Sequence, residues 1–385
     1  MAGSAKLGAP AVQGKGSCWP SEYQRLSDDK TGAVVHQLTQ HPSINHNLYF
    51  LNRSFTPDGR TVILTSYRDG DPNLFELAFP DGQIRQLTEG PQLHPFSACL
   101  SQSGEAVYFT RAGSIWKLMR TSLEETCLAT FEDSQLGECN LSHTGEWLVT
   151  AIKQRGNSGI AVARTDGSHQ DVALRWPRTI IHPQFHPLDQ QLIEFSSDPA
   201  PRMHLLDLQT GNVDCLHQHD NDEFVVHETF LGATPELVFT VWPFSLKRLH
   251  LQSRGIREIA AFNAWHILPN TDGTRILCDT NHPDVGIQIV DVATGIRRTI
   301  CHPRSSNGGT QWKTSRYAVA SDWARAAEEQ AERSQSLSWM EMKTDTVYGP
   351  QWTHPHPSWS PDEKQVIYTS DVSGTAQVYV AEIPF

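Results

Sequence analysis

The sequence predicts an all-β protein folded as a seven-bladed β-propeller. The first observation is a repeat of about 40 to 45 residues, which is the length of a four-stranded propeller blade. The second is that each copy sets a polar turn, such as Phe55–Gly59 (FTPDG), before an apolar strand. The third is that no helix-rich region of domain size competes with this pattern. We place the propeller at residues 31–385, after a partly flexible N-terminal extension at residues 1–30.

The copies of the repeat follow one another in a regular order. Each has a strand, a turn, a second strand such as TVILTS, another turn and a third strand. The turns of the seven copies lie at Phe55–Gly59, Leu100–Gly104, Leu141–Gly145, Phe185–Asp189, Phe230–Thr234, Pro269–Gly273 and Ser360–Glu363. Residues 33–40 resemble the fourth strand that the last copy lacks. We therefore expect them to close the ring as the outer strand of the blade formed by about residues 352–385.

One insertion departs from the repeat, between the sixth and the seventh copy. It covers about residues 305–348, and within it Tyr317–Ser334 is rich in Ala, Glu and Arg. This composition predicts one amphipathic helix. The helix is either a solvated decoration or a lid over the mouth of the ring.

Composition and charge exclude several classes of function. The net charge of −12 and the isoelectric point near 5.8 argue against nucleic acid as a partner. Neither a signal peptide nor an apolar stretch of membrane-spanning length is present, so we expect no membrane partner. The seven cysteines show no CxxC spacing and predict free thiols in a reducing compartment. A cytoplasmic protein is expected.

The segment Gln351–Trp359 (QWTHPHPSW) is a candidate metal site. In an extended strand His354 and His356 would project to the same side, because alternate residues share a face. Pro355 and Pro357 cannot donate to a sheet ladder, which confines such a strand to an edge or a cavity wall. Two neutral imidazoles on one face are well placed to bind a divalent metal, although such a pair can also be structural.

Further histidines precede other blades, where the innermost strand would line a central channel. A single histidine there is most often a hydrogen-bonded wall residue. Several at equivalent positions would form a constellation around one channel. The candidates are His46, His182, His227, His266, His354 and His356.

The chain resembles the oligogalacturonate lyase family of seven-bladed propeller enzymes. The resemblance is carried by QWTHPHPSWSPDEKQVIYTSD (351–371) and HNLYFLNRSFTPDG (46–59), and weaker similarity covers about residues 30–385. It implies β-elimination on short uronic-acid oligomers, with His227 as the catalytic base and Arg202 as the catalytic arginine. It also implies a manganese site formed by His266, Gln351, His354 and His356.

The chemistry of β-elimination accounts for these residue types. The C5 proton of a uronide is poorly acidic, so a metal and a guanidinium on the adjacent carboxylate stabilise the charge that develops. Arginine offers a bidentate fork that stays charged. Imidazole is mostly neutral near pH 7 and can accept the proton. Ligand softness alone favours Zn²⁺ or Ni²⁺ as much as Mn²⁺, so the resemblance carries the manganese assignment.

The resemblance implies the type of reaction more directly than it implies the substrate. The stretch before Arg202 lacks the histidine-bearing loop expected of enzymes acting on oligogalacturonate, and the helical insertion is additional. A glucuronate-containing oligomer or a uronide linked to a neutral sugar is therefore also open. Candidate substrate-binding residues are His46, His182 and Lys313, with Arg304 and Arg316 as further candidates for a second carboxylate.

The alternative to an enzyme is a non-catalytic TolB-like propeller that binds a protein or sugar ligand. Such propellers share the SPDG turns but need no metal in the channel. The combination of His227, Arg202 and the four candidate metal ligands favours the lyase, because a binding protein has no reason to hold all six. A propeller peptidase is excluded because the chain has no GxSxG motif.

Overall fold

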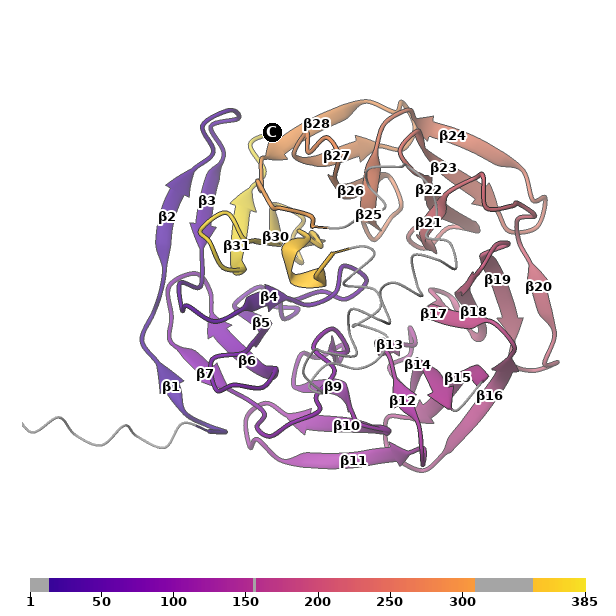
Figure 1. Ribbon diagram of the computed structural model, residues 1–385, viewed down its shortest axis with the longest axis horizontal. Helices are drawn as coiled ribbons and strands as arrows, with labels where there is room; N and C mark the ends of the chain where they lie inside the picture. The colour runs from indigo at the N-terminus through magenta and orange to yellow at the C-terminus, as the bar shows by residue number, and fades with distance from the viewer. Residues whose placement is uncertain (1–13, 155–156, 309–348) are drawn as a thin grey trace, which may run out of the picture.

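Seven antiparallel sheets form a ring around a common centre (Figure 1). The computed structural model describes residues 14–154, 157–308 and 349–385. All seven sheets are built from these residues, and each sheet is one blade. The predicted seven-bladed β-propeller is confirmed.

The first three blades occupy the N-terminal half of the chain. Blade 1 consists of β4 (Asn45–Asn47), β5 (Thr61–Ser66), β6 (Asn73–Ala78) and β7 (Ile84–Gln86), with β1 (Cys18–Trp19) paired outside β7. Blade 2 consists of β8 (Cys99–Leu100), β9 (Ala106–Arg111), β10 (Ser114–Met119) and β11 (Glu125–Thr130). Blade 3 consists of β12 (Gln135–Leu136), β13 (Asn140–Leu141), β14 (Trp147–Gln154), β15 (Asn157–Arg164) and β16 (Gln170–Trp176).

The next three blades have four strands each, with the first strand innermost (Figure 1). Blade 4 consists of β17 (Thr179–His186), β18 (Asp189–Asp198), β19 (Met203–Asp207) and β20 (Val213–Cys215). Blade 5 consists of β21 (Val225–Phe230), β22 (Glu236–Val241), β23 (Ser245–His250) and β24 (Ile256–Ala260). Blade 6 consists of β25 (Ala264–Pro269), β26 (Arg275–Thr280), β27 (Ile287–Asp291) and β28 (Arg297–Cys301).

Blade 7 combines the two ends of the chain. Its strands are β29 (Ser358–Trp359), β30 (Gln365–Ser370), β31 (Gln377–Glu382), β3 (Val34–Gln37) and β2 (Gln24–Ser27). Strand β3 pairs with β31 through Val35 and Ala381, and the indigo and yellow strands lie side by side in Figure 1. The outermost strand is β2, which pairs with β3, so residues before position 31 also contribute to the sheets.

The turn motif FTPDG joins the first strand of blade 1 to the second. In FTPDG, Gly59 has a φ of +68°, a conformation that costs glycine little. The Asp58 carboxylate accepts hydrogen bonds from the Thr56 hydroxyl (2.6 Å) and the Arg60 N–H (3.1 Å). The Thr56 N–H then donates to the Thr61 carbonyl at 2.8 Å, which sets up strand β5.

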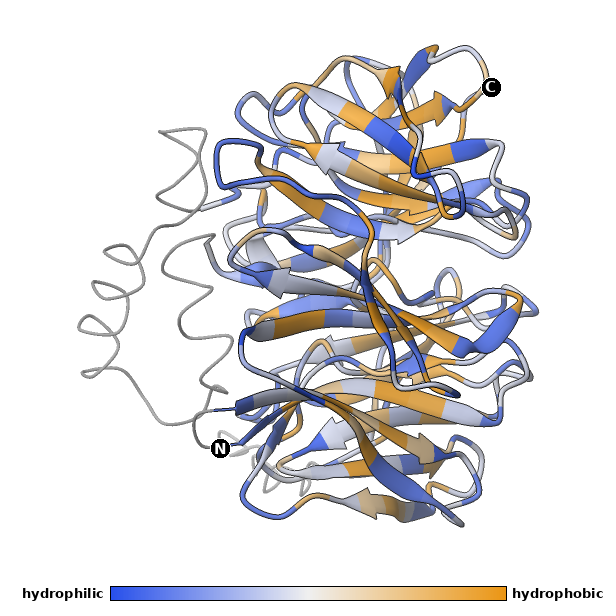
Figure 2. Cartoon of the chain, turned by 90° about the vertical axis from the view of Figure 1, so that its right-hand side faces the viewer, coloured by the Kyte–Doolittle hydropathy of each residue, from blue (hydrophilic) through white to orange (hydrophobic). Residues whose placement is uncertain are grey.

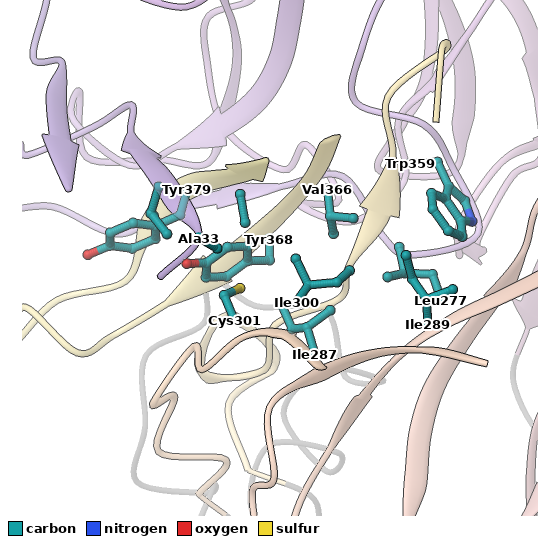
Figure 3. Packing of buried hydrophobic residues seen from close by; sticks show 12 residues of the cluster. Ala33, Leu277, Ile287, Ile289, Ile300, Cys301, Trp359, Val366, Tyr368 and Tyr379 are labelled. Atoms are coloured by element: carbon teal, nitrogen blue, oxygen red, sulfur yellow. The ribbon is translucent and has the colours of Figure 1, made fainter. Parts of the chain in front are cut away.

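Apolar side chains pack between neighbouring blades. Figure 2 shows strands dominated by apolar residues and connecting loops that are mostly polar. One cluster joins blade 6 to blade 7 and contains Ala33 together with Ile300, Trp359 and Tyr368 (Figure 3). The N-terminal segment therefore contributes to the core as well as to the last sheet.

The helix predicted at Tyr317–Ser334 lies outside the described residues. Within the described part, the chain before the last blade forms a single 3-10 turn, η2 (Gln351–Thr353). No helix in that part is long and apolar enough to cross a bilayer. All seven cysteines are free thiols, as the sequence predicts.

Candidate active site

Bulges in three inner strands carry three of the predicted histidines. In β17 the register passes from Ile181 opposite Ser196 to Gln184 opposite Glu194, so two residues face one. Strands β21 and β25 have the same irregularity. The bulged residues include His182, His227 and His266. Bulges re-aim side chains and are common beside active sites.

His354 and His356 reach the site from a segment that is not a strand. Strand β29 begins only at Ser358, so the expected strand geometry of the pair is wrong. Pro355 and Pro357 lack the N–H groups that a ladder needs. The backbone is extended at His354 and left-handed at His356, with a φ of +45°. The two imidazoles still lie close together, with ring centroids 5.8 Å apart.

The segment is fixed by hydrogen bonds to neighbouring strands. The Thr369 N–H in β30 donates to the carbonyl oxygen of Pro355 at 2.9 Å. The side-chain amide of Asn47 in β4 donates to the carbonyl oxygen of His356 at 2.7 Å. Blades 7 and 1 therefore both hold the backbone that presents these imidazoles.

Three imidazoles converge as a candidate metal centre. His266, His354 and His356 each offer a nitrogen, and these nitrogens lie within 4.8 Å of one another. Two ligands bonded to one ion at about 2.1 Å are at most about 4.2 Å apart, so small side-chain shifts would bring all three into contact with it. In the described part of the chain, the buried Nε2 of His356 has no hydrogen-bond partner. The donor set fits a divalent metal ion.

A buried carboxylate orients this centre. Asp279 lies opposite the bulge of β25 and accepts hydrogen bonds from His266 N (2.7 Å) and His266 Nδ1 (2.8 Å). The His356 N–H also bonds to it. Burial raises the pKa of Asp279 to about 7, against the lowering effect of these hydrogen bonds. With Nδ1 held by Asp279, His266 presents Nε2 to a metal, which is the usual arrangement of metal-binding histidines.

The fourth predicted ligand, Gln351, lies in η2 and is partly exposed. Its side-chain amide donates to the carbonyl oxygen of Gly349 at 3.4 Å. This bond uses the amide NH₂ group, so the side-chain oxygen of Gln351 is left as a possible ligand atom.

His227, the predicted base, lies beside the candidate metal centre. Its ring centroid is 4.5 Å from that of His266 and 4.3 Å from that of Trp265. Burial lowers the pKa of His227 well below 6.5, and the nearby His266, His182 and Arg202 add to this. In the described residues its Nδ1 has no hydrogen-bond partner. A neutral imidazole with an available nitrogen can accept a proton.

Arg202 is buried and held by two carboxylates. Its Nε donates to Glu228 Oε1 at 3.0 Å and its Nη2 to Glu228 Oε2 at 3.4 Å, while Nη1 bonds to Asp198. Burial raises the pKa of Glu228, but the charge and hydrogen bonds of Arg202 oppose this effect and bring the pKa below its usual value. Both members of the pair are therefore ionised. Glu228 thus occupies one bidentate edge of the guanidinium, and Asp198 occupies Nη1.

The predicted substrate-binding residues have different surroundings. His182 accepts or donates a 3.1 Å hydrogen bond with the Tyr49 hydroxyl. His46 is fully buried, stacks on Phe96 at 4.3 Å and bonds to the carbonyl oxygen of Asn47. Arg304 is half exposed and pairs with Asp29 at the surface. Lys313 and Arg316 lie outside the described residues.

Sequence reasoning missed the carboxylates and the tyrosine of the site. Asp279 and Glu228 are carboxylates within largely buried strands, RILCDT and VVHETF. A charged residue inside a buried strand is a usable signal, because it needs a partner there. Tyr49 gives no such signal, since an aromatic residue after an inner strand is ordinarily core.

The fold and the site define a seven-bladed β-propeller with a candidate metal centre of three histidines near the ring's middle. A profile of the oligogalacturonate lyase family matches residues 13–145 and 305–385. This match covers more than half of the chain, which therefore belongs to the oligogalacturonate lyase family.

Individual relatives agree with this assignment. Oligogalacturonide lyase of Pectobacterium atrosepticum is 23% identical over 411 residues, covering 96% of this chain and 98% of the relative. A structure of an oligogalacturonate lyase in complex with manganese matches with a TM-score of 0.80 at 21% identity, covering 97% and 99% of the two chains. The oligogalacturonate lyase of Vibrio parahaemolyticus matches with a TM-score of 0.78 at 19% identity, covering 96% and 99%. A TolB protein of Anaeromyxobacter dehalogenans matches only 23% of this chain, at 31% identity over 88 residues and 19% of its own length.

Proposed function

We propose that this protein is a metal-dependent lyase that cleaves uronic-acid-containing oligosaccharides by β-elimination. The observation that carries the proposal is the convergence of three imidazole nitrogens within 4.8 Å, with His227 directly beside His266. Membership of the oligogalacturonate lyase family supports the same reaction.

The proposed metal ligands are His266, Gln351, His354 and His356. We propose Mn²⁺ as the ion, because a family relative of the same fold binds manganese. When bound, the ion supplies a positive charge that polarises the C6 carboxylate of the uronide. Four neutral ligands leave that charge uncompensated, which favours an anionic substrate.

The chain's own residues would perform the remaining steps. Arg202 contacts the substrate carboxylate through Nη1, in place of Asp198, while Glu228 keeps the guanidinium fixed. His227 accepts the C5 proton, because burial and the neighbouring cations keep its imidazole neutral. Loss of the C5 proton and rupture of the C4–O bond yield a double bond between C4 and C5.

The proposed substrate is a short uronide oligomer, with oligogalacturonate as the first candidate because the family is named for it. His46, His182 and Lys313 remain proposed contacts to the sugar. We further propose a cytoplasmic location, since seven free thiols suit a reducing compartment.

The test is a screen of uronic-acid di- and oligosaccharides, followed by mass and by the ultraviolet absorbance of unsaturated uronates. His227→Ala should keep its bound metal and lose turnover by roughly two to four orders of magnitude, the usual contribution of a general base. His354→Ala should lose both metal and turnover. Metal content is measured by elemental analysis of each purified protein.

Three results would contradict the proposal. Products that carry added water would identify a hydrolase. Equal metal content in His354→Ala and the unmodified protein would exclude this metal centre. Absence of turnover on every uronide would favour a binding propeller.

A further inference from the structure

A chain of three polar side chains, Tyr49, His182 and Glu138, begins beside the candidate metal ligands; Tyr49 is buried and the other two are mostly shielded from solvent. The Tyr49 hydroxyl lies 3.1 Å from His182 Nε2, and the two rings stack with centroids 5.1 Å apart. On the other side of that imidazole, His182 Nδ1 lies 3.6 Å from Glu138 Oε1. With the proton on Nδ1 facing the carboxylate, Nε2 accepts the hydrogen bond from Tyr49.

The hydroxyl end of this chain belongs to the candidate active site. The Tyr49 ring is 5.0 Å from the ring of His356 and 6.5 Å from that of His266. His182 occupies the same bulge position in blade 4 that His227 occupies in blade 5, and both have a positive φ, of +54° and +57°. Two neighbouring blades therefore direct equivalent histidines toward the ring's middle.

The proposed elimination needs a second proton transfer that the residues assigned so far do not provide. His227 takes the proton from C5, and the C4–O bond breaks with its electron pair left on oxygen. That sugar oxygen is a strongly basic leaving group unless it gains a proton. Arg202 is occupied by carboxylates, and the three clustered histidines are assigned to the metal.

We propose, on the basis of that function, that Tyr49 is the general acid that protonates the leaving glycosidic oxygen. Its hydroxyl rotates away from His182 and delivers the proton as the C4–O bond breaks. The site's net charge is unchanged, because His227 gains one proton while Tyr49 loses one. Both exchange protons with water between turnovers, so no further reactant is needed. His182 and Glu138 are positioning residues, which hold the phenol in place before reaction.

The test compares leaving groups in the variant Tyr49→Phe, which keeps the ring and its packing. On a uronide with a sugar at O4, turnover should fall about 10²- to 10⁴-fold, as for loss of a general acid. On a uronide with a 4-nitrophenyl group at O4, the loss should be less than about tenfold, because this leaving group needs no proton. His182→Gln should show the same preference to a smaller extent.

Two controls separate this inference from the proposed function. Tyr379→Phe removes a hydroxyl from the core of blade 7 and should leave both rates unchanged. Metal content of Tyr49→Phe should equal that of the unmodified protein. Equal losses on both substrates, or full activity on the sugar substrate, would overturn the role of Tyr49 alone. An unmodified protein without turnover on either substrate would overturn the proposed function and this inference with it.

Discussion

Carboxylates contact several of the basic side chains in the candidate active site. Asp279 holds His266, Glu228 holds Arg202, and Glu138 faces His182. The hydrogen bonds of Asp279 and Glu228 fix the tautomer of His266 and the orientation of the Arg202 guanidinium. Such support costs desolvation, which the hydrogen bonds offset only because their geometry is good.

Asp279 gives the most direct test of this arrangement. Asp279→Asn replaces one acceptor oxygen with an NH₂ group, which cannot accept from His266 or from the His356 N–H. We expect divalent metal affinity to fall about 10- to 100-fold, the usual effect of losing an outer-shell partner. Titration calorimetry with Mn²⁺ measures the affinity, and thermal unfolding without metal measures the stability of the apo-protein.

Asp291→Asn is the matched control for that experiment. Asp291 caps a turn at the other end of the same sheet, where it accepts from Thr294 N at 2.8 Å. This variant should retain the metal affinity of the unmodified protein. An unchanged affinity in Asp279→Asn would show that the carboxylate does not position the metal ligands.

At the scale of single residues, the sequence predicted the histidines better than the carboxylates that contact them. The chain has 18 histidines, and a pair such as His354 and His356 is conspicuous within the matching family motif. Asp and Glu number 43 in this chain, and most carboxylates are solvated. Its place in a buried strand sets Asp279 apart from them, but its contact with His266 becomes evident only when its strand is placed against the bulge of β25.

At the scale of elements, turns were predictable and bulges were not. A turn such as FTPDG needs glycine where φ is positive, so its composition marks it. A bulge adds one residue to a strand without a fixed composition, and it is defined by the partner strand. This is why the inward direction of His182 and His227 was expected from their place before a blade, but its backbone cause was not.

The β2–β3 hairpin illustrates how one residue docks an element. Asp28, in its turn, accepts hydrogen bonds from Thr31 N (2.8 Å) and from His302 N (2.9 Å) in the segment after β28. Burial raises the pKa of Asp28, but the hydrogen bonds from His302 and Thr31 outweigh it and lower the pKa from 3.8 to about 2. Charged Asp28 therefore stabilises the fold above about pH 4, and this stabilisation is lost as the pH falls through 2.

Asp28→Asn should lower the free energy of unfolding by about 1–3 kcal/mol at pH 7, because the amide nitrogen cannot accept from His302. The difference from the unmodified protein should narrow as the pH falls from about 4 toward 2. Urea unfolding at several pH values measures this difference in free energy.

The neighbouring Asp29→Asn is the control. It removes only a surface pair with Arg304 and should change stability by less than about 1 kcal/mol. Equal effects of the two substitutions would contradict the docking role of Asp28.

At the scale of the whole molecule, the repeat determined the architecture. Seven copies predicted seven blades because each copy is one sheet that cannot bury both faces alone. The insertion could not be judged in the same way, since Tyr317–Ser334 lies outside the described residues. Closure of the ring depends on strand pairing between residues more than 300 positions apart, such as Val35 with Ala381.

Removing the N-terminal strands tests how far the whole ring depends on that pairing. Val35 and Leu38 are buried, and a buried residue of this size contributes about 1.5–3 kcal/mol, against a total stability of about 5–15 kcal/mol for a typical protein. A chain starting at Gln40 lacks β1, β2 and β3 and leaves the edge of β31 unpaired. We expect it to lose its cooperative urea transition and to associate through that edge.

A chain starting at Asp28 keeps β3 and should unfold cooperatively at a lower urea concentration than the full chain. A peptide of residues 28–40 added to the shorter chain should restore the transition by adding a strand to the sheet. Identical midpoints for the full chain and the chain starting at Gln40, measured by circular dichroism, would show that the ring is stable without its N-terminal strand.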